Sequence, residues 1–396
     1  MTERIDKRAY WIWLQHAFTP GSSKPRAIFN RFGNIKEFYD GGAALWAEFR
    51  FITDKEVSAL YNYTIKHAQA ALDYAESLGQ HVITPECKEY PECLWNIKDP
   101  PAVLYIQGKM PDVDHILSIA IVGSRKAKPD SLNIANRIAY DLSKSGTIVI
   151  SGGAMGIDAE AHKGSMMGIS PTICVLGCGL DVQYLMKNEH MRRQVIEKGG
   201  ALITEYPPGT QIQRGTFQAR NRIISGLSKG VLIVCAGWKS GTMITAKRAV
   251  EQDRVVFAVP GSPAEETSYG PNSLIKDGAV PVTNAEDILH EYEAFYDFKT
   301  DINVYSNMSE IVDEPDEYVV TEYIIDEDDR QVKDTDVSLS ENGRKVLEVL
   351  TAEPQHISEV AKKTGLKTSL ISAAMTELEI LGLATDFAGK RYALKK

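Results

Sequence analysis

The chain has 396 residues, of which 43% are hydrophobic and 24% are charged, and its net charge at pH 7 is −9. This composition is ordinary for a globular protein of about two to four domains and excludes a wholly disordered or collagen-like chain. The longest apolar run, at 231–238, is too short to cross a membrane, and residues 1–10 lack the apolar core of a secretion signal. We therefore expect a cytoplasmic protein that has no membrane partner.

The first 80 residues are predicted to form a small helical module. Apolar residues recur at helical spacing over 7–17, 24–32 and 55–78, and Pro-Gly and Gly-Gly pairs separate these segments. Gly33 follows the second segment, as expected of a glycine that ends a helix. A stretch rich in proline comes next and leads to a short predicted strand at 103–106.

From residue 116 the pattern changes to strands that alternate with helices. The predicted strands are continuous apolar runs, which is typical of strands covered on both faces. A parallel, doubly wound, Rossmann-like α/β sheet is therefore expected over 81–295. Its strands are predicted at 119–123, 147–153, 172–177, 201–204, 231–234 and 255–259, and its helices at 131–145, 156–167, 187–198, 217–227 and 242–252.

The negative charge of the chain is concentrated in one later segment. Residues 301–336 contain thirteen acidic and two basic residues. The net negative charge of this segment therefore exceeds that of the whole chain. We interpret 296–338 as a solvated acidic linker. The rest of the chain is slightly basic, which removes an objection to nucleic-acid binding.

Residues 339–396 are predicted to form a winged helix-turn-helix domain. Amphipathic helices are expected near 340–350, from 357 onward, and over 367–381, with a tight turn at 364–366. A hairpin follows, formed by 382–384 and 391–394 around a turn at Ala388 and Gly389. Because this module is only weakly basic, both weak DNA contact and protein docking stay open.

Three glycine-rich turns each follow a predicted strand and precede a helix. The carboxyl ends of parallel strands share one edge of a sheet, so these turns should line one crevice. Glycine lets the backbone approach an anion, helix N-termini offer N–H groups, and hydroxyls and an arginine add donors. The phosphate-binding residues predicted in these turns are Gly123, Ser124, Arg125, Ser151, Gly152, Gly153, Gly156, Ser240, Gly241 and Thr242.

The helix predicted near 217 is expected to add further contacts. Arg220, Asn221 and Arg222 can grip a second phosphate. Phe217 can stack on a base or pack in the core. Lys187, at the start of another helix, is either solvated or a further phosphate contact.

Common cofactor and metal sites are not supported by the sequence. It has no P-loop string, and Gly152, Gly153 and Gly156 miss the dinucleotide-binding spacing by one residue. The five cysteines form no Cys-x-x-Cys pair, so we expect buried thiols and no metal. His162 has no nucleophile placed beside it, and we interpret it as a core or surface residue. We expect no cofactor and no catalytic residue.

The glycine-rich turns belong to a set of blocks at 121–125, 151–162, 177–182, 205–209, 220–227, 240–246 and 259–261. In this order the blocks resemble the DNA-processing protein A (DprA/Smf) family, and the helical module resembles its SAM-like accessory. The resemblance implies a single-stranded DNA-binding recombination mediator without catalysis. It would protect incoming strands, help load RecA recombinase during natural transformation, and act as a homodimer. It also implies that the residues predicted above, apart from Gly156 and Phe217, form the phosphate pocket and that Lys187 contacts DNA.

The chain departs from the family pattern at Leu185, Cys235 and Gln218, where the family often has Pro, Glu and Pro. Two other functions stay open. A nucleotide phosphoribohydrolase could use the same anion-binding edge, but its Gly-Thr-x-x-Glu pattern has Thr245 in place of the acid–base Glu. A transcription regulator could use the winged helix.

Overall fold

The computed structural model describes residues 5–183, 188–238, 240–298, 341–351, 353–366, 368–380, 383–387 and 391–394. The chain divides into two compact units, residues 1–307 and residues 308–396. The acidic segment at 301–336 lies outside the described residues, as does the predicted linker apart from its first three residues. No helix within the described residues is long and apolar enough to cross a membrane.

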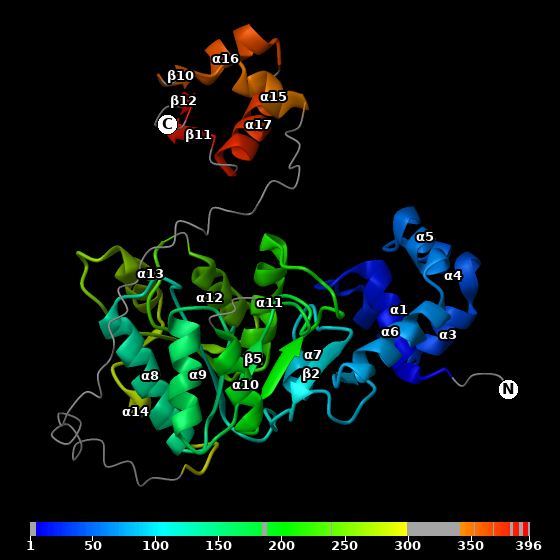
Figure 1. The fold of residues 1–396 in the computed structure, drawn as a ribbon, viewed down its shortest axis with the longest axis vertical. Coiled ribbons are helices and arrows are strands. Elements are labelled where there is room, and N and C mark those ends of the chain that lie inside the picture. The colour runs from blue at the N-terminus through cyan, green and yellow to red at the C-terminus, as the bar shows by residue number, and fades with distance from the viewer. Residues whose placement is uncertain are drawn as a thin grey trace. The chain divides into compact units, whose positions relative to one another are not determined.

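A mostly parallel sheet forms the core of the first unit and confirms the predicted doubly wound α/β fold (Figure 1). Within the described ranges its nine strands have the order β1-β2-β6-β5-β4-β3-β7-β8-β9. All pairs from β6 to β9 are parallel, whereas β2 runs antiparallel to both β6 and β1. The strands are β1 (His81–Ile83), β2 (Leu104–Gly108), β3 (Ser118–Val122), β4 (Ile148–Ser151), β5 (Thr172–Val175), β6 (Ala201–Thr204), β7 (Gly230–Ile233), β8 (Val255–Ala258) and β9 (Val280–Pro281).

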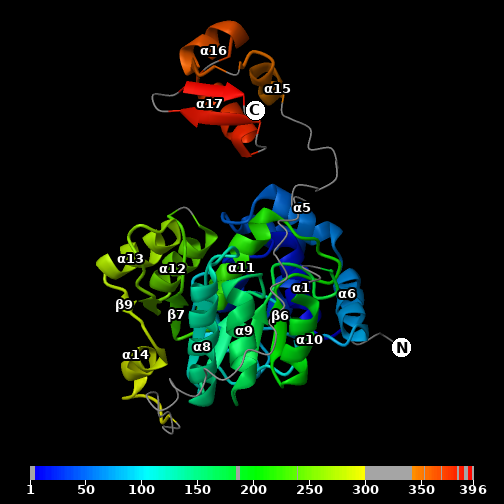
Figure 2. The same ribbon diagram turned by 60° about the vertical axis from the view of Figure 1, so that its left-hand side comes forward.

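Helices cover both faces of this sheet. Ile119 and Ile121 of β3 pack toward one set of helices, while Ala120 and Val122 pack toward the other, which explains the continuous apolar run. The first set is α8 (Pro129–Lys144), α9 (Ile157–Met167), α10 (Glu189–Glu197) and α14 (Ala285–Leu289), of which α8, α9 and α10 stand side by side in Figure 2. The second set includes α7 (Glu92–Trp95), α11 (Arg214–Gly226), α12 (Gly241–Glu251) and α13 (Tyr269–Lys276).

The helical module packs around its first helix. Its helices are α1 (Lys7–Phe18), α2 (Lys24–Phe32), α3 (Ile35–Asp40), α4 (Gly42–Glu48), α5 (Asp54–Asn62) and α6 (Ile65–Ser77). The single helix expected at 55–78 is wrong: Tyr63 is extended, and a new helix starts after Thr64. The backbone N–H of Thr64 donates to Nδ1 of His67, an interaction that stabilises this second start. Helices α3 and α4 were not predicted.

The module and the sheet form one hydrophobic body within the first unit. Val82 of β1 and Val103 and Tyr105 at β2 lie in the same core cluster as the tryptophans of α1. A buried hydrogen bond of 2.7 Å joins the Gln15 amide to the main-chain carbonyl of Glu205, which follows β6. The helical module is therefore fixed to the end of the sheet formed by β1, β2 and β6, opposite the end formed by β8 and β9.

The second unit has the element order predicted for a winged helix-turn-helix. Its elements are α15 (Glu341–Leu347), β10 (Gln355–His356), α16 (Ile357–Thr364), α17 (Thr368–Ile380), β11 (Ala384–Phe387) and β12 (Arg391–Leu394). Gly365 ends α16 in the left-handed conformation, as the predicted tight turn requires. The short strand β10 was not predicted and pairs with β12. The predicted turn at Ala388 and Gly389 lies outside the described residues.

Replacement of Trp13 by Ala is expected to destabilise the first unit by about 3–5 kcal/mol. The indole is fully buried against Phe38 and Trp46, and its N–H donates to the Leu60 carbonyl at 2.9 Å. Urea unfolding of the full chain measures the destabilisation. Tyr61→Ala is the control because Tyr61 is 70% exposed, so its change should stay within about 0.5 kcal/mol. Equal destabilisation in the two variants would contradict the assigned core.

Candidate functional site

The site lies at the carboxyl edge of the parallel sheet, where the strand order reverses. From β3 the chain continues to β4 on one side, whereas β7 lies on the other side. The loops that follow β3 and β7 therefore lead to helices on opposite faces of the sheet, which is the position where open α/β sheets bind ligands. The Ser124 N–H donates to the Cys235 carbonyl at 3.0 Å and ties the two loops together at their base.

The structure brings the glycine-rich turns after β3 and β4 into direct contact. Gly156 has φ +77°, and a β-carbon on it would lie 2.4 Å from the main-chain oxygen of Ser124. A β-carbon on Gly123 would lie 2.6 Å from the Ile157 side chain. Gly152 has no space for a β-carbon either, because Arg220 Nη1 would lie 2.1 Å from it. These glycines thus allow the loops to pack closely against each other and against α9 and α11.

Three residues predicted to contact phosphate instead have their polar groups inside the protein. The Ser151 hydroxyl is fully buried and donates to the Ile121 carbonyl at 2.6 Å. Arg220 is 4% exposed and donates to the main-chain carbonyls of Gly152 and Val175. Arg222 is 1% exposed and forms an ion pair with a carboxylate. All three side chains therefore support the turns from inside the protein and do not line the surface of the site.

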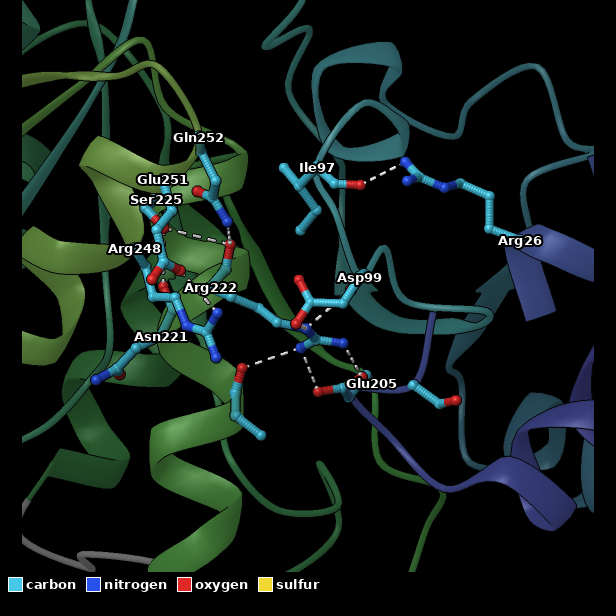
Figure 3. A network of polar contacts seen from close by, with 12 residues as sticks. Arg26, Ile97, Asp99, Glu205, Asn221, Arg222, Ser225, Arg248, Glu251 and Gln252 are labelled. Carbon is cyan, nitrogen blue, oxygen red and sulfur yellow. Dashed lines mark hydrogen bonds and ion pairs between the residues drawn. The ribbon is translucent and has the colours of Figure 1, made fainter. Parts of the chain in front are cut away.

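The ion pair of Arg222 is the centre of the polar network in Figure 3. Both of its Nη atoms donate to the carboxylate of Glu205 at 2.7 Å, and Glu205 is also 1% exposed. The Nε atom donates to the main-chain carbonyl of Asp99 at 2.9 Å. Burial alone would lower the pKa of Arg222, but the carboxylates of Glu205 and Asp99 raise it, so the guanidinium stays charged. The only indication of this pairing in the sequence is the position of Glu205 in a motif block.

Arg125 differs from these buried arginines because its side chain is exposed. Its guanidinium lies 5.1 Å from the ring centroid of Phe217, and the guanidinium of Arg220 lies 5.9 Å from the same ring. The half-buried ring of Phe217 therefore packs between two cations and orients Arg125. The packing alternative for Phe217 is the one that this geometry favours. Lys126, which directly follows the Gly-Ser-Arg motif, is also exposed and was not among the predicted residues.

The N-terminus of α12 lies at the same edge, directly after the β7 loop. Ser240 caps the helix by accepting from the Thr242 N–H at 3.1 Å. Gly241 is exposed, and the Asn221 amide from α11 donates to its carbonyl at 3.4 Å. The positive end of the helix dipole thus points to solvent beside an amide donor. Lys187 lies outside the described residues.

Beneath the turns is a buried polar layer. His162 is fully buried, and its Nδ1 lies 2.9 Å from the Thr172 hydroxyl, which itself donates to the Val149 carbonyl. Nδ1 therefore carries the hydrogen in this pair. Burial, with a smaller contribution from the Arg220 charge, lowers the pKa of His162 to about 3. The core interpretation of His162 is confirmed.

The thiols are also largely internal. Four of the five cysteines, Cys93, Cys174, Cys178 and Cys235, are buried as predicted, whereas Cys87 is half-buried. Burial raises the pKa of Cys174 to about 12, so it stays a neutral thiol at physiological pH. Within the described part of the chain, no three His, Cys, Asp or Glu side chains are grouped so that they could hold a metal.

The chemistry available at this edge is anion binding. The exposed Arg125 and the N-terminus of α12, which is capped by Ser240, both lie at this edge, in the loops after β3 and β7. The first turn of α12 contains no acidic residue, and Thr245 stands buried where a phosphoribohydrolase would have its Glu. The arrangement therefore supplies no acid–base carboxylate at that position.

The fold and site define a Rossmann-like α/β protein with an anion-binding edge, a helical module and a winged helix. Residues 81–293 match the family model described as DNA recombination-mediator protein A, and residues 333–390 match the model of the DprA winged helix domain. The chain is 34% identical over 329 residues to Protein Smf of Synechocystis, spanning 81% of this chain and 82% of that protein. This chain belongs to the DNA recombination-mediator protein A family.

Two further relatives agree with this membership. The DNA processing protein DprA of Bacillus subtilis is 40% identical over 217 residues, which span 54% of this chain and 71% of that protein. The X-ray structure of DNA processing protein A from Streptococcus pneumoniae superposes with a TM-score of 0.61 and 28% identity. It covers 73% of this chain and 99% of that one.

Removal of the Glu205 carboxylate is expected to destabilise the first unit strongly. Glu205→Ala leaves the buried Arg222 charge unpaired and should lower the free energy of unfolding by about 3–5 kcal/mol. Urea unfolding of the purified chain measures this change. Glu251→Ala, which breaks an exposed ion pair with Arg248, should lower it by less than about 1 kcal/mol. A Glu205→Ala chain as stable as this control would refute the assigned role of the pair.

His162 should make the protein less stable in mild acid. Its pKa is about 3 in the folded state and about 6.5 in the unfolded chain, so the unfolded state binds the extra proton as pH falls below 6.5. Between pH 7.5 and 5.5 this linkage lowers the free energy of unfolding by about 1.4 kcal/mol. In His162→Gln that part of the pH dependence should vanish, as measured by urea unfolding at both pH values.

The control for this experiment is His115→Gln. A hydrogen bond to Asp112 raises the pKa of the exposed His115, so its stabilising contribution is present at low pH and disappears as pH rises. Its removal should not flatten the dependence on pH. A His162→Gln chain that keeps the full wild-type slope would contradict the buried, neutral state of His162.

Proposed function

We propose that this chain binds single-stranded DNA along the carboxyl edge of its sheet and acts as a recombination mediator rather than an enzyme. The strand's phosphates would contact the loop of Ser124 and Arg125 and the N-terminus of α12 at Ser240, Gly241 and Thr242. Family membership supports a role in DNA recombination. The geometry supports the location of the site.

The observation that carries the proposal is the exposed Arg125 held against Phe217 at the switch point of the sheet. Two loops tied together at their base carry a cation and a helix N-terminus at the same edge of the sheet. Such an array can bind successive phosphates without reading base edges. Binding should therefore depend on salt and tolerate any sequence.

The winged helix is a weaker candidate for the main DNA contact. The second helix of its helix-turn-helix motif is α17. The sequence of this helix, TSLISAAMTELEI, contains two acidic residues and no Lys or Arg. A helix of this composition would meet the phosphates of a major groove without a compensating cation. We therefore assign the winged helix an accessory role and do not favour a transcription regulator.

The proposal extends to RecA and to self-association. In this role the chain would protect an incoming strand in natural transformation and then help to load RecA recombinase onto it. A homodimer would double the length of strand that is bound. RecA filament formation on strands precoated with a single-strand-binding protein tests the loading step. Sedimentation equilibrium tests the dimer. If the chain does not accelerate filament formation, the loading role is refuted while the DNA-binding proposal stands.

Arg125→Glu is expected to weaken single-stranded DNA binding at least tenfold, because it replaces a cation beside a phosphate with a repulsive charge. Fluorescence anisotropy with labelled oligo(dT) across a salt series measures the effect. The slope of log affinity against log salt should become shallower by about 0.7 for each phosphate that the variant no longer neutralises. Matched duplex should bind more weakly than oligo(dT) to the unaltered chain.

The control variant is Lys198→Glu, which makes the same change of charge at the opposite edge of the sheet. Lys198 is exposed at the end of α10, just before β6 begins. Its substitution should leave oligo(dT) binding almost unchanged. If both variants bind like the unaltered chain, or if duplex is preferred, the edge at Arg125 and α12 is not the DNA site.

A further inference from the structure

One tryptophan of this chain stands apart from the others. Trp11, Trp13, Trp46 and Trp95 all pack in the core of the helical module, as members of the cluster or against it. Trp238 is 64% exposed. An indole is the largest apolar side chain, and its exposure forgoes a substantial gain from burial. Tryptophan is enriched at binding interfaces, where its indole supplies a large flat contact surface.

The backbone holds Trp238 at the rim of the candidate site. It occupies the turn between β7 and α12, two residues before Ser240, so the two Cα atoms are at most about 7 Å apart. The turn is closed by the Ser240 N–H, which donates to the Gly237 carbonyl at 3.1 Å. Both main-chain groups of Ala236 bond to a neighbouring segment, with Thr267 at 2.7 Å and with Gly270 at 2.9 Å. The base of the turn is therefore anchored.

The charges around the turn differ from one end to the other. Toward α12 are the cap of Ser240 and the helix N-terminus, which attract a phosphate. Toward β7, the Glu266 carboxylate lies 3.9 Å from the point where a β-carbon on Gly237 would be. A carboxylate repels phosphate and leaves an uncharged base unaffected. Along the chain, Trp238 lies between the residue beside the Glu266 carboxylate and the N-terminus of α12. This position suits the base of a nucleotide, which is flat and uncharged.

We propose that Trp238 is a base-stacking residue, and that its indole receives a base of the nucleotide whose phosphate lies at the N-terminus of α12. This inference rests on the proposed function and adds the interaction that separates single strands from duplex. In a duplex the bases are paired and stacked on each other, so their faces are closed to an indole. Backbone contacts alone would not discriminate in this way.

The test compares two ligands and three forms of the full chain. Oligo(dT) and a phosphodiester strand of equal length without bases are each titrated against the unaltered chain, Trp238→Ala and Trp238→Phe by fluorescence anisotropy. Trp238→Ala should bind oligo(dT) about fivefold or more weakly, which is the effect of removing one base–aromatic stack. It should bind the baseless strand as the unaltered chain does. Trp238→Phe should restore most of the affinity for oligo(dT).

Phe295→Ala serves as the matched control. Phe295 is 78% exposed and follows Tyr292, whose hydroxyl lies near Gly230 at the opposite edge of the sheet. Its removal should change neither titration. The indole fluorescence of the unaltered chain should be quenched on addition of oligo(dT), and this quenching should be smaller in Trp238→Phe.

The outcomes separate the two levels of the proposal. If the unaltered chain binds neither ligand, the proposed function itself fails. If it binds oligo(dT) and Trp238→Ala binds equally well, the DNA site stands but stacking by Trp238 is refuted. Equal weakening toward both ligands, together with a changed sedimentation coefficient, would assign Trp238 to contact between copies of the chain and would also overturn the stacking proposal.

Discussion

The buried ion pair between Arg222 and Glu205 joins parts of the chain that are distant in sequence. It connects α11 to the end of β6 and, through the carbonyl of Asp99, to the segment that precedes β2. The main-chain oxygen of Glu205 accepts the amide of Gln15, so the helical module is joined to the same point. An ion pair that is buried away from solvent tolerates little displacement. If the two side chains moved apart, each would lose its hydrogen bonds and the charge that compensates its own. The candidate site at the sheet edge depends on this fixed frame.

The same principle explains why neighbouring residues of α11 have different roles. Successive helical residues point about 100° apart, so Arg220, Asn221 and Arg222 leave the helix in three directions. Arg220 supports the turn after β4, Arg222 fixes β6, and Asn221 reaches the start of α12. From the sequence alone, a motif of two arginines and an asparagine suggests phosphate binding. In the folded chain its cations hold carbonyls and a carboxylate, and the exposed Arg125 takes the position nearest to solvent.

The parallel sheet could be predicted from the sequence because strands buried on both faces are uninterrupted apolar runs, and β3 to β8 coincide with these runs to within one residue at their starts. Strands β1 and β9 escaped prediction because they have three and two residues and exist through pairing with distant neighbours. The break at Tyr63 and Thr64 escaped because helical periodicity resumes after it. Within the site, the turns could be located from glycine spacing. The burial of Ser151, Arg220 and Arg222 could not, because it depends on contacts with Ile121, Val175 and Glu205 that lie far away in the chain.

The two outer strands of the sheet differ from ordinary open edges. At one side, the main-chain oxygen of Val82 in β1 accepts from the guanidinium of Arg8 at 3.1 Å, and helices of the N-terminal module pack against the strand. At the other side, β9 ends at Pro281, which has no N–H to offer a further strand. Both outer strands therefore carry a feature that disfavours strand addition from another molecule. We therefore expect assembly through the first unit to use helix faces and loops rather than the pairing of edge strands.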